Sequence, residues 1–186
     1  MRTFIAVFPP PEVRETLLRA VHDLSTRGNV RWSRPENVHL TLMFLGDVPE
    51  EELAPVRDVL TTVSTRHEPF EAETFGFGAF PSAKKARVVW AGIGKGHNLL
   101  RALAEDLENS LEALGFDSEG RDYRPHLTLG RVRGRPARLE LPKTTAQGLR
   151  FPVREVELVR SMLGEAGAAY STLATYPLSE SGDQGS

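Results

Sequence analysis

Leucine and valine recur every three or four positions in three stretches of the chain, the spacing of an amphipathic helix. These stretches are residues 12–27, residues 53–63 and residues 97–114. Proline and acidic residues at 47–52 are typical of a helix start, because negative charge is favoured in the first turn. Gly115 stands where a helix C-terminal cap is expected, which predicts that the third helix ends there.

Shorter hydrophobic runs, bounded by proline, glycine or polar residues, predict strands. We expect them over residues 3–8, 38–45, 70–77, 87–93 and 126–132, followed by a closing hairpin of 155–162 and 170–178. Helices and strands therefore alternate, and the last part is strand-rich. The pattern predicts an α+β fold with mixed or antiparallel sheets, built as two similar lobes within one domain over residues 1–178. Residues 179–186 form a polar C-terminal tail.

Composition narrows the classes of function. The formal net charge is −2, which argues against a protein held to nucleic acid by charge alone, although one phosphate can still be gripped locally. There is no cysteine, so thiol catalysis and thiolate metal sites are excluded. No apolar run is long enough to cross a membrane, and prolines end the short apolar run at the N-terminus. We expect a cytoplasmic protein.

One tetrapeptide occurs twice, and each copy begins at one of only five histidines. His39-Leu40-Thr41-Leu42, the first motif, recurs as His126-Leu127-Thr128-Leu129, the second motif. Each copy follows a proline-containing segment and lies in a predicted strand. A single His-x-Thr in a strand is usually only a half-buried strand, but two copies in matched contexts favour a site.

The alternation of side chains along a strand gives this repeat its chemical meaning. Histidine and threonine share one face, and the leucines share the other, so the leucines can anchor the strand while His and Thr line a cleft. One neutral imidazole can take a proton from water while the other, protonated, gives one to a leaving oxygen. The hydroxyls of Thr41 and Thr128 can donate to phosphate oxygens. A metal site is a weaker reading, since Thr is a poor ligand and no carboxylate shares the histidine face.

The paired motifs resemble those of the two-histidine phosphoesterases, specifically the RNA 2′,3′-cyclic phosphodiesterase branch. The likeness extends over roughly residues 2–178. The flanking segments that carry it are RW (31–32), PEN (35–37), FLG (44–46), GAFP (78–81), RVVWAG (87–92) and RP (124–125).

The resemblance implies a bilobal, pseudo-twofold fold with sheets lining a central cleft and helices outside. It implies hydrolysis of a terminal 2′,3′-cyclic phosphate of RNA to a 2′-phosphate without metal or cofactor, and a reversible 2′–5′ RNA ligation. It assigns His39 as proton donor and His126 as proton acceptor; the near-symmetric motifs alone do not distinguish them. RNA ends, including those of tRNA halves, are the implied partners, and we expect a monomer.

The resemblance also makes Arg131 a phosphate-clamp candidate. Strict alternation puts Arg131 on the leucine face, but Gly130 allows a bulge that would re-aim it. Two runs of basic residues, 131–138 and 84–87, could each bind an RNA backbone or form a solvated surface. For residues 84–87 the solvated surface is the preferred interpretation.

Other aromatic and histidine residues carry weaker signals. Three aromatic residues could stack a base, although the first two are more often core: Trp32, Phe80 and Tyr123. His22, His67 and His97 are predicted to be structural or solvent-exposed. The segment 92–96 lacks full Walker spacing, so nucleoside triphosphate binding is rejected.

Two alternatives to the RNA cyclic phosphodiesterase remain. A non-catalytic module for RNA ends would bind phosphate without turnover, although pure binding needs cations more than a matched acid and base. A hydrolase of the same superfamily could instead act on small cyclic nucleotides, and the dependence on substrate length would separate it from an RNA enzyme.

Overall fold

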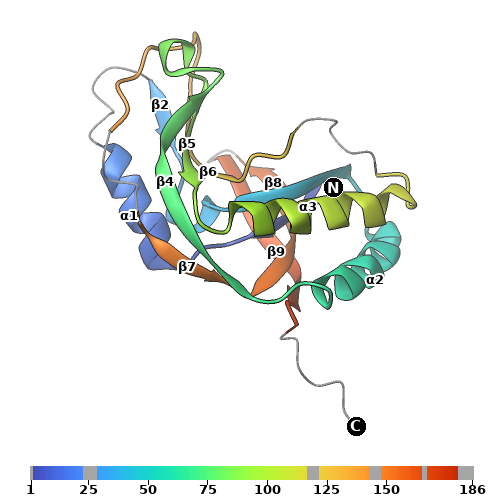
Figure 1. The fold of residues 1–186 in the computed structure, drawn as a ribbon. Coiled ribbons are helices and arrows are strands. Elements are labelled where there is room, and N and C mark those ends of the chain that lie inside the picture. The colour runs from blue at the N-terminus through green and yellow to red at the C-terminus, as the bar shows by residue number, and fades with distance from the viewer. Residues whose placement is uncertain (1, 23–28, 117–121, 143–147, 165–166, 180–186) are drawn as a thin grey trace.

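The strands of both halves join one curled antiparallel sheet, shown in a computed structural model that describes residues 2–22, 29–116, 122–142, 148–164 and 167–179 (Figure 1). Within these residues the sheet has nine strands in the order β7-β4-β5-β6-β3-β1-β8-β9, with β2 added beside β6. The predicted α+β fold is confirmed. Every pairing between the described strands is antiparallel.

The helices are α1 (Pro11–His22), α2 (Leu53–Ser64) and α3 (His97–Glu112), with short 3₁₀ turns at η2 (Pro35–Asn37), η3 (Glu50–Glu52) and η4 (Ala83–Lys85). The strands are β1 (Arg2–Val7), β2 (Val30–Trp32), β3 (Leu40–Asp47), β4 (Phe70–Phe80), β5 (Val88–Ile93), β6 (His126–Val132), β7 (Arg150–Val153), β8 (Glu155–Gly164) and β9 (Gly167–Pro177).

Most predicted elements are present. The third helix and the β8–β9 hairpin lie where they were expected. Gly115 has φ 85°, a left-handed conformation that glycine adopts without the steric cost of a Cβ, and its N–H donates to the carbonyl of Glu112. The end of the first predicted helix, residues 23–28, lies outside the described residues, as do 180–186 of the predicted tail. Ser179, the first tail residue, is tied back by its backbone N–H to the carbonyls of Ser64 and His67.

Several boundaries were wrong, and two strands were missed. β2 is three residues long and exists through its pairing with β6, while β7 contains Pro152, a residue typical of edge strands. The acidic run at 50–52 forms a 3₁₀ turn, and α2 begins only at Leu53. β4 continues to residue 80, into the predicted loop. β3 begins at Leu40, so His39 lies immediately before the strand rather than inside it.

One core holds the two motif strands against the helices. The motif leucines Leu40, Leu42, Leu127 and Leu129 are at most 2% exposed and share this core with the apolar faces of all three α-helices. Burying a leucine contributes about 1.5–3 kcal/mol. The leucine faces therefore fix β3 and β6 against the helices and leave the other face of each strand for the site. No described helix combines the length and apolar character needed to cross a membrane.

Candidate active site

The two motifs are neighbours in the sheet. β3 and β6 pair antiparallel at Leu40 and Leu127, the second residue of each motif. Continuing this register by one residue in each direction sets Thr41 across from His126 and His39 across from Thr128. The two motifs, 87 positions apart in the chain, are thus brought side by side, close enough for the charge of His126 to act on His39.

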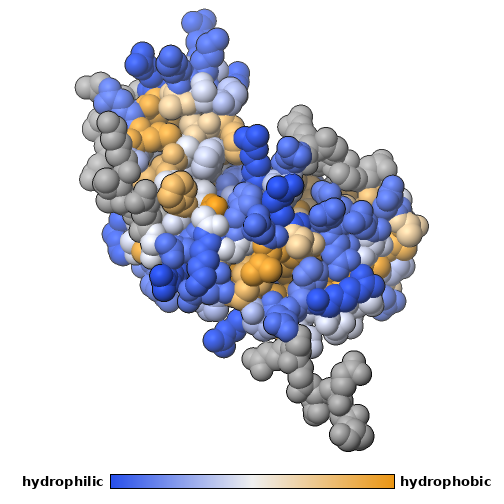
Figure 2. Space-filling model, in the orientation of Figure 1, coloured by the Kyte–Doolittle hydropathy of each residue, from blue (hydrophilic) through white to orange (hydrophobic). Residues whose placement is uncertain are grey.

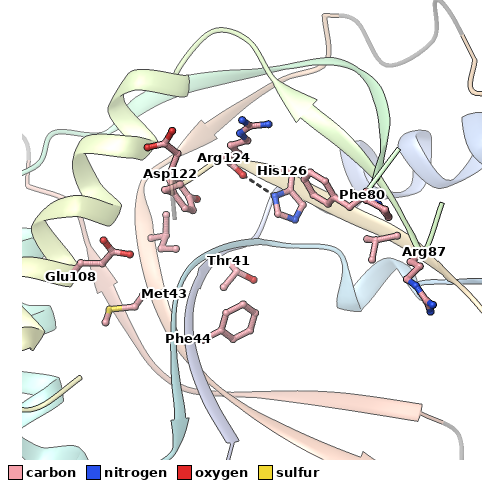
Figure 3. Close-up of a pocket in the computed structure, with 13 residues that line it drawn as sticks. Thr41, Met43, Phe44, Phe80, Arg87, Glu108, Asp122, Arg124 and His126 are labelled. Atoms are coloured by element: carbon pink, nitrogen blue, oxygen red, sulfur yellow. Dashed lines mark hydrogen bonds between the residues drawn. The ribbon is translucent and has the colours of Figure 1, made fainter. Parts of the chain in front are cut away.

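Both imidazoles are held by the same backbone contact. His39 Nδ1 lies 2.8 Å from the carbonyl oxygen of Asn37, and His126 Nδ1 lies 2.7 Å from that of Arg124. A carbonyl only accepts, so Nδ1 carries the proton in each ring. When the ring is neutral, Nε2 is left with its lone pair for chemistry. Figure 3 shows this bond at His126, at the middle of the cleft.

Aromatic rings enclose His39. The ring of Phe4 stacks on the imidazole at a centroid distance of 4.9 Å, Phe8 lies at 5.2 Å, and Tyr170 meets it edge-on at 5.1 Å. The pKa of His39 is lowered from 6.5 to about 4, chiefly by burial; the bond to the Asn37 carbonyl raises it, and the nearby His126 and Arg131 lower it. His39 is therefore neutral near pH 7 in the free protein.

His126 has a similar but more open setting. Phe80 meets its ring edge-on at 5.2 Å, and Trp90 lies at 6.4 Å. Burial lowers the pKa of His126, the bond to the Arg124 carbonyl raises it, and the charge of Arg131 lowers it. The guanidinium thus acts on both imidazoles.

A bulge in β6 brings Arg131 to the histidine side. Opposite β5, Thr128 pairs with Trp90 and Arg131 pairs with Val88, with a register shift between them. Trp90 and Val88 are two residues apart and share a face, so Thr128 and Arg131 share a face as well. The predicted bulge is confirmed. Gly130 has no room for a side chain, because a Cβ would lie 2.6 Å from the ring of Trp32.

β3 has its own bulge at the same point of its motif. Opposite β1, Thr41 pairs with Ala6 and Phe44 pairs with Phe4, with a register shift between them. Phe44 therefore corresponds to Arg131: each lies three residues after the threonine of its motif, beyond a bulge. Its side chain is 56% exposed and lines the cleft. Phe44 was missed as a site residue because strict alternation from Thr41 would have directed it into the core.

A cleft of about 830 Å³ is lined by residues of both motifs. Thr41, Phe44 and His126 line it, together with Tyr123 (Figure 3). Glu108 of α3 and Asp122 lie toward one end of the cleft, and Arg87 lies toward the other. His39, Thr128 and Arg131 are not among the lining residues and lie beside the cleft.

The remaining candidates divide by position. Phe80 and Tyr123 line the cleft, whereas Trp32 packs into the core and only partly reaches the surface. Burial and the neighbouring Glu108 raise the pKa of Tyr123, so it is a neutral phenol.

The other histidines lie away from the motifs. His67 Nε2 lies 3.0 Å from Asp106 and links α2 to α3, and His22 is exposed at the end of α1. His97 differs, because it lines a second hollow of about 460 Å³ that also reaches His126. Among the described residues, no group of three or more His, Asp or Glu side chains is placed to hold a metal ion.

Comparisons with known proteins identify the family of this chain. A family model described as LigT like Phosphoesterase matches residues 7–90 and 94–170. A curated protein of Archaeoglobus fulgidus, named RNA 2′,3′-cyclic phosphodiesterase, is 35% identical over 95% of this chain and 99% of its own. A crystal structure of a Thermus thermophilus protein superposes with a TM-score of 0.83 at 33% identity, covering 96% of this chain and 98% of that chain.

A further crystal structure is that of E. coli LigT complexed with 3′-AMP. It superposes with a TM-score of 0.78 at 26% identity, covering 96% of this chain and 98% of LigT. The match of the family model over most of the chain, together with the curated relative at 35% identity, shows that this chain belongs to the LigT-like phosphoesterase family of two-histidine phosphoesterases.

Proposed function

We propose that this chain hydrolyses the terminal 2′,3′-cyclic phosphate of RNA to a 2′-phosphate, using His39 and His126 as its acid–base pair and no metal ion. The observation that carries the proposal is the matched setting of the two imidazoles, each held at Nδ1 by a backbone carbonyl two residues before it. The curated relatives support the substrate class, because they are named RNA 2′,3′-cyclic phosphodiesterase.

The reaction requires that one proton be removed from water and that one be donated to the leaving 3′ oxygen. His126 Nε2 accepts a proton from water as the water oxygen bonds to phosphorus. The bond from phosphorus to the 3′ oxygen breaks, and His39 Nε2 donates a proton to that oxygen. The product has a 2′-phosphate and a free 3′-hydroxyl; His126 then releases its proton to solvent and His39 takes one up, which restores the starting pair. General acid and base catalysis of this kind contributes about 10²–10⁴-fold each.

Three further residues stabilise the charge that develops on the phosphate oxygens. The Thr41 and Thr128 hydroxyls donate to non-bridging oxygens, a role that the pairing of the two motifs at Leu40 and Leu127 supports. Arg131, re-aimed by the bulge, supplies a fixed positive charge beside them. The exposed ring of Phe44 offers a stacking face for the terminal base.

The donor role of His39 depends on the substrate. In the free protein its pKa is about 4, so few molecules carry the proton at neutral pH. A bound phosphate adds negative charge beside both imidazoles and offsets the charge of Arg131, which raises their pKa values. Binding of the anion thus prepares His39 to donate.

The same pair supports ligation as a secondary activity. If the 5′-hydroxyl of a second RNA replaces water, its oxygen bonds to phosphorus and the 3′ oxygen leaves as before, giving a 2′–5′ phosphodiester. Hydrolysis and ligation then share His39 and His126, and tRNA halves are suitable ends for both. We propose that the chain acts as a monomer in the cytoplasm.

The direct test is hydrolysis of a short RNA ending in a 2′,3′-cyclic phosphate, with EDTA present. We expect wild type to give a product with a 2′-phosphate, resolved from the 3′-phosphate isomer by chromatography. His39→Ala and His126→Ala should each lower kcat by at least about 10²-fold. His67→Ala, which removes an imidazole outside the cleft, is the matched control and should retain activity.

Folding is checked by circular dichroism, so that loss of turnover reports chemistry alone. Near-full turnover by folded His126→Ala would contradict the mechanism. Tight binding of phosphorylated ends by a folded wild type without any turnover would favour the non-catalytic binding module. Turnover restricted to mononucleotides would favour a small cyclic-nucleotide phosphodiesterase.

A further inference from the structure

The fold brings two separate basic runs onto one surface. Residues 84–87 follow β4, and residues 131–138 begin in β6. Strand pairing joins Val88 to Arg131, and an isolated bridge joins Ala86 to Ala137. The exposed cations on this surface, which we call the basic lobe, are Lys84, Lys85, Arg87, Arg131, Arg133, Arg135 and Arg138.

The basic lobe is free of neighbouring acids along both segments. Residues 75–104 and 123–139 contain no Asp or Glu, and Glu140 is the first acid after the second run. The chain has net charge −2, so removing these seven positive charges leaves −9 on the remainder. Like charges gathered in this way repel one another, and a polyanion relieves that repulsion. Figure 2 shows hydrophilic side chains at the upper end of the molecule, over the β4–β5 tip.

A small core of its own supports the basic lobe. Ala79, Ala86, Val89 and Leu139 are at most 9% exposed, and Trp32 of β2 packs against them. The N–H of Leu139 also donates to the carbonyl of Ala83. The cations therefore project from a packed platform, and shortening the exposed ones leaves these contacts in place.

The basic lobe is continuous with the active site. Arg87 lines the same cleft as His126. Arg131 lies close enough for its charge to lower the pKa of both His39 and His126. The opposite end of the cleft carries Glu108 and Asp122 together with Arg124, so the charges there largely offset one another, whereas Arg87 marks a purely positive end (Figure 3).

We propose that the basic lobe binds the phosphodiester backbone of the RNA on the 5′ side of the cyclic phosphate. This inference rests on the proposed function. A 2′,3′-cyclic phosphate terminates its chain, so all further phosphates of the substrate lie 5′ of the terminal nucleoside. They must leave the site over a surface next to the cleft, and the basic lobe attracts them more strongly than the opposite end, where Glu108 and Asp122 offset the charge of Arg124.

The test compares a mononucleotide with a longer chain. Adenosine 2′,3′-cyclic phosphate reaches the active site alone, whereas an RNA octamer with the same terminus also reaches the basic lobe. In the variants Lys84→Ala/Lys85→Ala and Arg135→Ala/Arg138→Ala, we expect KM for the octamer to rise roughly tenfold at 0.1 M salt. Each lost phosphate contact should also lower the slope of log KM against log salt by about 0.7.

The matched control removes two cations from the other end of the molecule. Lys95 and Arg154 are exposed, and Lys95→Ala/Arg154→Ala should leave KM for the octamer close to wild type. Equal octamer KM values in this control and the basic-lobe variants would overturn the inference, and so would an equal rise in KM for the mononucleotide. Neither result affects the proposed function. If folded wild type turns over neither substrate, the proposed function fails, and the inference fails with it.

Discussion

Leu40 of β3 is the direct partner of Leu127 of β6, so the two His-Leu-Thr-Leu motifs meet at their equivalent residues. Antiparallel strands that pair at equivalent positions are related by a local twofold axis. The axis relates His39 to His126 and sets each of them across from the threonine of the other strand. A one-residue slip would turn either strand's histidine to the core, and the buried leucines oppose such a slip.

The pH dependence of turnover should differ between the free protein and the complex. The profile of kcat/KM reports the free protein, in which both imidazole pKa values are lowered, so its optimum should lie below pH 6.5. The profile of kcat reports the complex, in which the bound phosphate raises both pKa values. We expect its optimum at higher pH, measured with adenosine 2′,3′-cyclic phosphate over pH 4–9. Identical optima, or a kcat/KM optimum above pH 7.5, would contradict the assignment.

Stability should fall in acid because of His39. Between pH 6.5 and 4 the unfolded chain binds a proton at this imidazole and the folded chain does not, so the free energy of unfolding falls as pH falls. The shift from 6.5 to about 4 corresponds to about 3 kcal/mol. His39→Gln should lose less stability over this range by up to about that amount, measured by urea unfolding. Thr41→Val is the control and should keep the wild-type dependence; an unchanged dependence in His39→Gln would refute the prediction.

Replacing Arg131 should have two measurable effects. In Arg131→Ala the positive charge is lost, so the pKa values of His39 and His126 should rise in an NMR titration. The phosphate loses a donor, and kcat/KM for the mononucleotide should fall by about 10²–10³-fold. Arg131→Lys keeps the charge without the guanidinium fork, so it should retain lowered pKa values and part of the activity. Unchanged pKa values and full turnover in Arg131→Ala would show that Arg131 has no role in the active site.

Phe44 can be tested against a second exposed hydrophobic residue. Phe44 and Leu99 are 56% and 51% exposed, but only Phe44 lines the motif cleft, and Leu99 lines neither hollow. Stacking on a base contributes about 1–3 kcal/mol, so Phe44→Ala should raise KM by roughly 5- to 150-fold while kcat changes little. Leu99→Ala should leave both constants near wild type. An equal change of KM in both variants would mean that the loss of exposed hydrophobic surface, and not base stacking, causes the effect.

Features that depend on local spacing could be predicted from the residues alone. The alternation in each motif separated the buried leucines from the histidine face, helical periodicity identified α3, and Gly115 marked its end. The glycine after the second motif also indicated the bulge that re-aims Arg131. Each of these signals comes from a few adjacent residues, and packing did not override them.

Features that depend on distant partners could not be predicted in this way, because they arise when the chain folds. The bulge in β3 that exposes Phe44 is defined by its register against β1, and β2 exists because β6 accepts it as a neighbour. The lowered pKa of His39 arises from burial among rings as far away in sequence as Tyr170. The basic lobe forms because strand pairing joins two runs more than 40 residues apart. Register, burial and summed charge are properties of non-local contacts, which residue spacing does not encode.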